Sequence, residues 1–222
     1  MQRASRVTRA ISAALAVAIG GASILPATAI ADTSGLAGAT GTLSDGSSIT
    51  QTSDDTFVVS EDGRESTITV MEADGTRTVT IVDSLTGESN EFVYDEGAET
   101  IYSSYTGNTI DANDIKETSG PVTRSSSTHA TYSFDYASIK SAVGSAGNVV
   151  SLTGFILSKT GAFTMDAGPV ITLGAILSGI SGVIPNDPYH GIRVTVTTTK
   201  YYRNGNRIPY RTTKAVTGLT TY

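Results

Sequence analysis

The chain contains no cysteine and no tryptophan. The lack of cysteine excludes disulfides, thiolate metal sites, a thiol nucleophile and a lipid-modified cysteine anchor. The motifs G-x-S-x-G and H-E-x-x-H and a phosphate-binding loop are also missing. We therefore expect no enzyme activity, no cofactor and no metal. An unrecognised hydrolase that uses one of the two histidines, His129 or His190, is the alternative.

Residues 1–31 have the features of a secretory signal peptide. Three arginines precede an apolar run at residues 10–25, which is short for a bilayer core that needs about 20 residues. Ala29 and Ala31 then form an A-x-A site, which predicts cleavage before Asp32. The alternative is an N-terminal membrane anchor. We expect the mature protein to be secreted and extracellular, and to be exported by the route of a Gram-positive bacterium.

The charge is divided between the two halves of the chain. Residues 32–120 hold 18 acidic and three basic residues, whereas residues 121–222 hold three acidic and nine basic ones. Such asymmetry predicts an acidic partner for the basic half. For an exported protein we expect an anionic bacterial membrane or wall polymer rather than nucleic acid. Either the acidic half is a neutralising propeptide, or the two halves lie side by side permanently.

The acidic half is expected to be rich in β-strands. Residues 32–53 are small and polar, which predicts disorder. Residues 54–110 show strand-like segments at 56–60, 65–71, 76–82 and 88–94, separated by Asp-Gly turns and related turns. This spacing predicts an antiparallel meander. Calcium ligation by Asp54-Asp55, Glu61-Asp62 or Asp111 with Asn113 and Asp114 is the alternative to simple turns.

Residues 111–128 carry Gly120-Pro121 and a Ser/Thr run with no hydrophobic period, which predicts an exposed linker. Lys116 and Arg124 are candidate processing sites for a trypsin-like protease. An ordinary interdomain linker is the alternative.

The C-terminal half, residues 129–222, begins with an unusual apolar region. Residues 141–158 and 167–185 carry no charge, and we expect them to form a helix–loop–helix hairpin. Small residues at four-residue spacing predict close helix packing, and those in the second segment include Gly174, Ser178, Gly179 and Gly182. A hairpin that inserts into membranes, helices buried in a soluble fold, and strands are the three alternatives.

The clearest local signal is a β-hairpin at residues 192–217 around Asn204-Gly205. A two-residue loop places Arg203 opposite Asn206 and Tyr201 opposite Ile208. Tyrosine favours bilayer interfaces and cations attract anionic headgroups. The predicted membrane-interacting residues are Lys200, Tyr201, Tyr202, Arg203, Arg207 and Arg211. A plain basic surface hairpin is the alternative.

The predicted fold class is α+β: an N-terminal antiparallel meander, a glycine-rich helical hairpin and a C-terminal β-hairpin. This arrangement, with its basic Lys200-Tyr201-Tyr202-Arg203 segment, resembles large, unmodified secreted bacteriocins of the geobacillin-like kind. The resemblance implies antibacterial action through membrane disruption, with self-association as a further expectation. A wall-polymer-binding or structural protein without killing activity is the alternative.

Overall fold

The computed structural model describes residues 40–42, 48–53, 55–61, 63–119, 127–162, 164–165, 176, 183–202 and 208–222. Residues Ser34–Tyr222 group into one compact unit. The predicted signal peptide, with Ala29 and Ala31, lies outside the described residues.

Sheet A is an eight-stranded antiparallel meander in which each strand pairs with its sequence neighbours. Its strands are β1 (Thr40–Thr42), β2 (Ser48–Ser53), β3 (Thr56–Glu61), β4 (Arg64–Ala73), β5 (Thr76–Asp83), β6 (Ser89–Asp95), β7 (Thr100–Ser103) and β8 (Thr109–Asp111). The predicted meander is confirmed. Asp74 and Gly75 in the β4–β5 turn both have positive φ, 52° and 75°, as a type I′ turn requires.

The prediction of disorder is wrong for residues 48–53. These residues form β2, in which Ile49 and Gln51 are buried. Their side chains alternate between the two faces, so a polar segment with one apolar residue can still add a strand to an existing edge.

Sheet B has five strands in the order β11-β13-β12-β10-β9. They are β9 (Lys116–Ser119), β10 (Ser127–Asp135), β11 (Thr164–Met165), β12 (Gly191–Tyr201) and β13 (Arg211–Thr221). The linker predicted at residues 111–128 is therefore largely structured where it is described. A 3-10 helix, η1 (Ala112–Asp114), and β9 occupy most of its described residues. Lys116 is exposed in β9, whereas Arg124 lies outside the described residues.

Two helices follow β10: α1 (Tyr136–Val143) and α2 (Val149–Thr160). The single helix predicted over residues 141–158 is therefore wrong, because the chain leaves α1 at Gly144, whose φ is 80°. The Asn148 side chain then starts α2 as one half of a capping box with Ser151. The predicted second helix lies mostly outside the described residues, as do Gly174, Ser178, Gly179 and Gly182.

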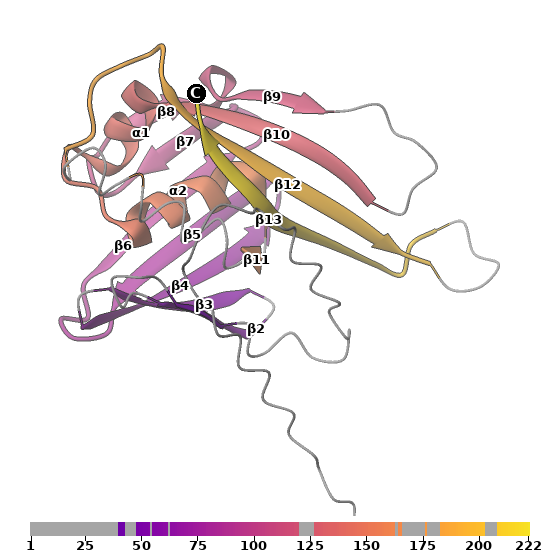
Figure 1. Ribbon diagram of the computed structural model, residues 1–222. Coiled ribbons are helices and arrows are strands. Elements are labelled where there is room, and N and C mark those ends of the chain that lie inside the picture. Colours follow the sequence, from indigo (N-terminus) through magenta and orange to yellow (C-terminus); the bar gives the residue numbers. More distant parts are fainter. Residues whose placement is uncertain are drawn as a thin grey trace, which may run out of the picture. The chain divides into compact units, whose positions relative to one another are not determined.

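Helix α2 is surrounded by apolar partners. Every residue of α2 except Lys159 is buried, which is typical of a helix that is apolar on all sides and lies inside a core. Its Phe155 ring lies 5.8 Å from Phe92 of β6 and 5.5 Å from Phe134 of β10. Figure 1 shows α2 between the strands of sheet A and those of sheet B. One aromatic row thus joins both sheets through the helix.

The acidic and basic halves share one hydrophobic core. This core includes Val79 and Ile81 from sheet A, Leu152 and Ile156 from α2, and Val194 from sheet B. The boundary predicted between residues 110 and 129 does not separate two cores. Among the described residues, no helix has both the length and the apolar character needed to cross a bilayer.

Gly154 of α2 permits the close approach of the helix to sheet A. A Cβ at this position would lie 2.6 Å from Ile81 Cδ1 and 3.2 Å from the Phe92 ring. We predict that Gly154→Val lowers the free energy of unfolding by about 2 kcal/mol, because overpacking displaces both side chains. Urea denaturation measures the change.

The adjacent Thr153 supplies the control. Its Oγ1 is fully buried and has no hydrogen-bond partner among the described residues. Thr153→Val keeps the shape and removes a desolvated hydroxyl, so stability should hold or rise by about 1 kcal/mol. Equal losses in the two variants would contradict a specific contact at Gly154.

Candidate functional site

The far end of the β12–β13 hairpin is the candidate interaction site. Where the structure describes both strands, the pairing of β10 with β12 ends at Ser127 and Thr199, and β12 continues to Tyr201. Figure 1 shows these strands running away from the helices. We define the hairpin tip by its described residues: Lys200, Tyr201, Tyr202, Ile208, Tyr210 and Arg211. Arg203 and Arg207 lie outside the described residues.

The predicted register of this hairpin is wrong by three residues. Tyr201 pairs with Arg211, not with Ile208, and Thr199 pairs with Thr213. Pro209 explains the shift, because it has no N–H to donate to the ladder and pairing stops on its C-terminal side. The connection between the strands therefore spans residues 202–210 instead of two residues.

The shift changes which side chains share a face. Arg211 lies on the same side of the sheet as Tyr201, whereas Lys200 pairs with Thr212 on the other side. The two-residue loop expected at Asn204-Gly205 would place Lys200 and Arg211 on one face, and this expectation is wrong. The two cations instead flank the tip from opposite faces.

Apolar side chains are exposed at the tip. Ile208 is 81% exposed, Tyr210 59% and Tyr202 46%. The Tyr201 and Tyr210 ring centroids lie 6.4 Å apart. Ile208 and Tyr210 were not among the predicted site residues. Their proximity to Pro209 was the one sequence signal that they belong to the connection.

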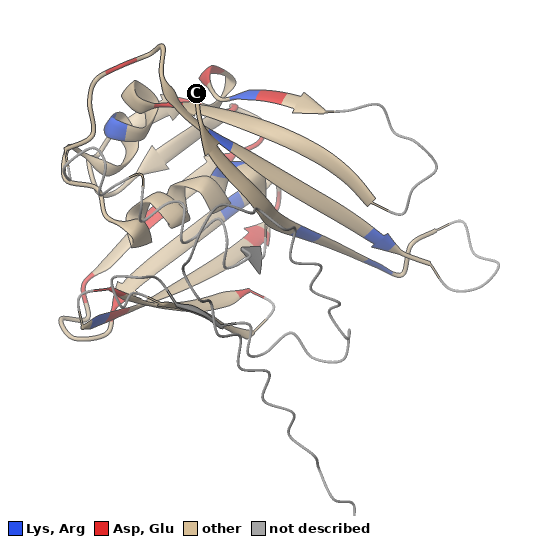
Figure 2. Cartoon of the chain, in the orientation of Figure 1, with Lys and Arg blue, Asp and Glu red and all other residues tan. Residues whose placement is uncertain are grey.

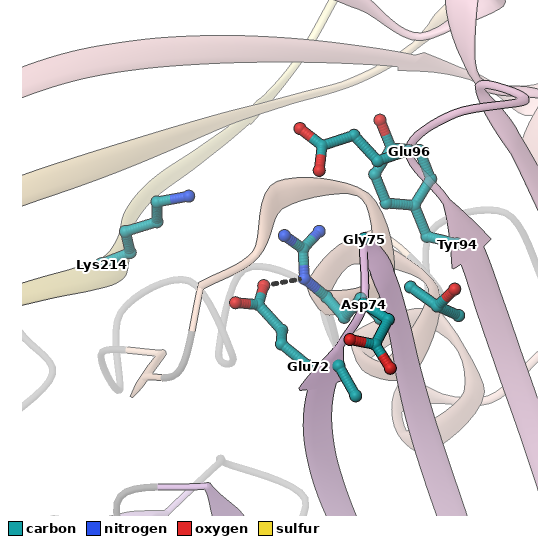
Figure 3. A pocket seen from close by; sticks show the side chains of 9 residues that line it. Glu72, Asp74, Gly75, Tyr94, Glu96 and Lys214 are labelled. Atoms are coloured by element: carbon teal, nitrogen blue, oxygen red, sulfur yellow. Dashed lines mark hydrogen bonds and ion pairs between the residues drawn. The ribbon is translucent and has the colours of Figure 1, made fainter.

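A pocket lies between the β4–β5 turn and β13. This pocket has a volume of about 370 Å³. Figure 3 shows Lys214 of β13 on one side of the pocket, with its side chain pointing toward the opposite side, where Glu72 and Glu96 lie. The lining residues are Glu72, Ala73, Asp74, Gly75, Thr76, Arg77, Tyr94, Glu96 and Lys214.

Arg77 at the base of this pocket ties sheet A to α2. Its Nε forms an ion pair with Glu72 Oε1 at 2.5 Å. Its Nη1 donates to Ser158 O at 2.7 Å, at the C-terminal end of α2. A cation at this end satisfies carbonyls that have no partner within the helix and opposes the helix dipole. Sequence reasoning missed Arg77, because nothing local marks an arginine in a strand as a helix cap.

The ring of Tyr94 forms cation–π contacts with two basic side chains. Arg77 Cζ lies 5.5 Å and Lys159 Nζ 5.2 Å from the ring centroid. Burial lowers the pKa of Lys159, and nearby carboxylates, led by that of Glu117, oppose this effect. The arrangement stabilises the contact between α2 and sheet A, so its role is structural.

The remaining candidates take part in local contacts. Asp187 Oδ2 lies 2.7 Å from His190 Nδ1, and the backbone N–H of Tyr189 together with His190 lowers the pKa of Asp187. His129 Nδ1 lies 3.0 Å from Thr197 Oγ1 on the next strand. Asp111 caps η1 by accepting a hydrogen bond from Asn113 N. Among the described residues, no group of three or more His, Asp or Glu side chains could hold a metal ion.

Comparison of the chain with protein-family models, with curated proteins and with solved structures found no match in any of the three. Its function therefore has to be inferred from the geometry and charge of its own residues.

We predict that Arg77→Met lowers the free energy of unfolding by about 2 kcal/mol, because the carbonyls at the end of α2 lose a charged donor. Arg64→Met is the matched control. Arg64 is exposed at the start of β4, and its replacement should change stability by less than about 0.5 kcal/mol. Chemical denaturation compares the two variants, and equal effects would show that Arg77 does not cap the helix.

Proposed function

We propose that the protein is secreted and binds anionic bacterial membranes through the hairpin tip. The observation that supports this proposal most directly is the combination of exposed apolar and cationic side chains there. Ile208, Tyr210 and Tyr202 are exposed, and Lys200 and Arg211 flank them in the sequence.

The composition of the tip suits a lipid interface. Tyrosine places an apolar ring and a polar hydroxyl at the headgroup level. Each cation near an anionic leaflet contributes about 1 kcal/mol to binding. When an aliphatic side chain as exposed as that of Ile208 leaves water for the bilayer interface, the free energy falls. A soluble polyanion alone would offer nothing to this side chain.

The tip is a better candidate for membrane contact than the apolar helix. Phe155 and Leu157 of α2 are fully buried, and Phe155 contacts both sheets. Withdrawing α2 would expose this surface to water at a cost of several kcal/mol. Peripheral contact by the tip requires no such rearrangement. Antibacterial action, the expectation from the bacteriocin-like layout, belongs to the proposal as a consequence of this contact.

The experiment is vesicle cosedimentation of the chain that starts at Asp32, with phosphatidylglycerol or phosphatidylcholine vesicles. We predict binding to the anionic vesicles that weakens as salt rises. The double variant Tyr202→Ser/Ile208→Ser should bind about tenfold more weakly, because it loses two apolar contacts with the interface. A growth assay on Gram-positive cells, run with the same proteins, tests killing.

Met71→Ser/Leu85→Ser is the matched control, since these side chains are 62% and 78% exposed in sheet A and its turns. This variant should bind like the parent. If the tip variant also binds like the parent, the tip is not the binding site. Parent protein that binds neither kind of vesicle would overturn the proposal.

A further inference from the structure

The outer face of sheet B, which points away from α2, is covered with hydroxyl groups. On β12 the buried Ile192, Val194 and Val196 alternate with outward-facing side chains. Strand pairing brings outward-facing threonines from three strands together. We call this surface the hydroxyl face and define it by Thr131, Thr195, Thr197, Thr199, Thr213 and Thr217.

Hydrogen bonds across the strands orient these hydroxyls. Thr197 Oγ1 lies 2.8 Å from Thr217 Oγ1 on β13 and 3.0 Å from His129 Nδ1 on β10. Thr199 Oγ1 lies 3.3 Å from Ser127 Oγ. A β-bulge between Thr195 and Val196 shifts the register by one residue, and this is where Thr217 meets Thr197. The hydroxyls of Thr197, Thr199 and Thr217 are therefore held in place, and little entropy would be lost in ordering them around a ligand.

Each end of the hydroxyl face carries an arginine and a tyrosine. At one end, Arg193 Cζ lies 4.6 Å from the centroid of the Tyr222 ring. At the other end, Tyr201 pairs with Arg211 on the same face. Arg193 and Tyr201 are eight residues apart along β12, which is about 26 Å of strand. This distance suits an extended ligand better than a small molecule.

The charge of this face is positive where the structure describes it. Lys116 of β9 pairs with Ser133 and joins Arg193 and Arg211 on the same side. Figure 2 shows basic but no acidic segments along β12 and β13. Asp135, at the end of β10, is engaged in capping α1 through Ser138. An anionic partner therefore meets no opposing carboxylate along these two strands.

We propose that the hydroxyl face binds an anionic, hydroxyl-rich polymer, a polyol-phosphate chain that lies along β12. The threonines exchange hydrogen bonds with the polyol hydroxyls, and the arginines pair with its phosphates. The terminal tyrosines pack against carbon atoms of the chain. A bilayer does not fit this surface, because apart from its tyrosines it exposes no large apolar side chain. This site shares Tyr201 and Arg211 with the hairpin tip, but it does not depend on membrane binding there.

The experiment titrates the chain that starts at Asp32 with poly(glycerol phosphate) by isothermal calorimetry. Polyphosphate supplies charge without hydroxyls, and dextran supplies hydroxyls without charge. We predict that poly(glycerol phosphate) binds at least about tenfold more tightly than either, since each lacks one class of contact. Equal binding of polyphosphate and poly(glycerol phosphate) would overturn the proposal.

The triple variant Thr195→Val/Thr197→Val/Thr199→Val removes three hydroxyls and keeps β-branched side chains. We predict that it binds poly(glycerol phosphate) about tenfold more weakly, with little change toward polyphosphate. The matched control is Thr67→Val/Thr69→Val/Thr80→Val on the outer face of sheet A, which should bind normally. Equal affinities of the triple variant and the parent would contradict the proposal.

Two further variants keep the test decisive if the triple variant fails to fold. Arg193→Gln should weaken binding and reduce its dependence on salt, because one ion pair with the polymer is lost. Tyr202→Ser/Ile208→Ser should retain full polymer affinity, which separates this site from the hairpin tip. Loss of polymer binding in the tip variant alone would place the site at the tip and overturn the proposal.

Discussion

The structure depends on one constraint: every residue of α2 except Lys159 is buried, so the helix has to be covered on two opposite sides. Sheet A covers one side through Phe92, and sheet B covers the other through Phe134. Neither sheet alone could remove this helix from water. Arg77 adds a polar link to the same contact, since it reaches from β5 to the last carbonyls of α2. The acidic half is thus a structural partner of the basic half, not only its electrostatic complement.

This constraint also locates the surfaces that remain for function. Because α2 is enclosed, the surfaces that sheet B offers to a partner are its outer face and the free end of its hairpin. The tip combines exposed apolar side chains with cations, whereas the outer face combines ordered hydroxyls with cations. The two surfaces meet at Tyr201 and Arg211. A protein that contacts a bacterial envelope could use both together, with the polymer along the sheet and the tip at the lipid.

The sequence predicted local structure well where each signal was local. Asp-Gly pairs and alternation placed β3 to β6, because turn geometry and side-chain alternation act over a few residues. The register at Tyr201 failed because Pro209 overrode the Asn204-Gly205 signal. The burial of α2 was one of three alternatives, since an apolar glycine-containing segment suits a lipid bilayer and a core equally. Arg77 and the hydroxyl face depend on contacts between residues far apart in sequence, which no local pattern reveals.

The shared core is tested most directly by cutting the chain between the two halves. In the experiment, a specific protease site is placed within residues 120–126, between β9 and β10, and the folded protein is treated with the protease. Size-exclusion chromatography then shows whether the two pieces stay together. The shared core predicts that they elute as one species in native buffer and separate only in denaturant. Separation in native buffer, with a folded basic piece, would contradict it and favour a releasable acidic propeptide.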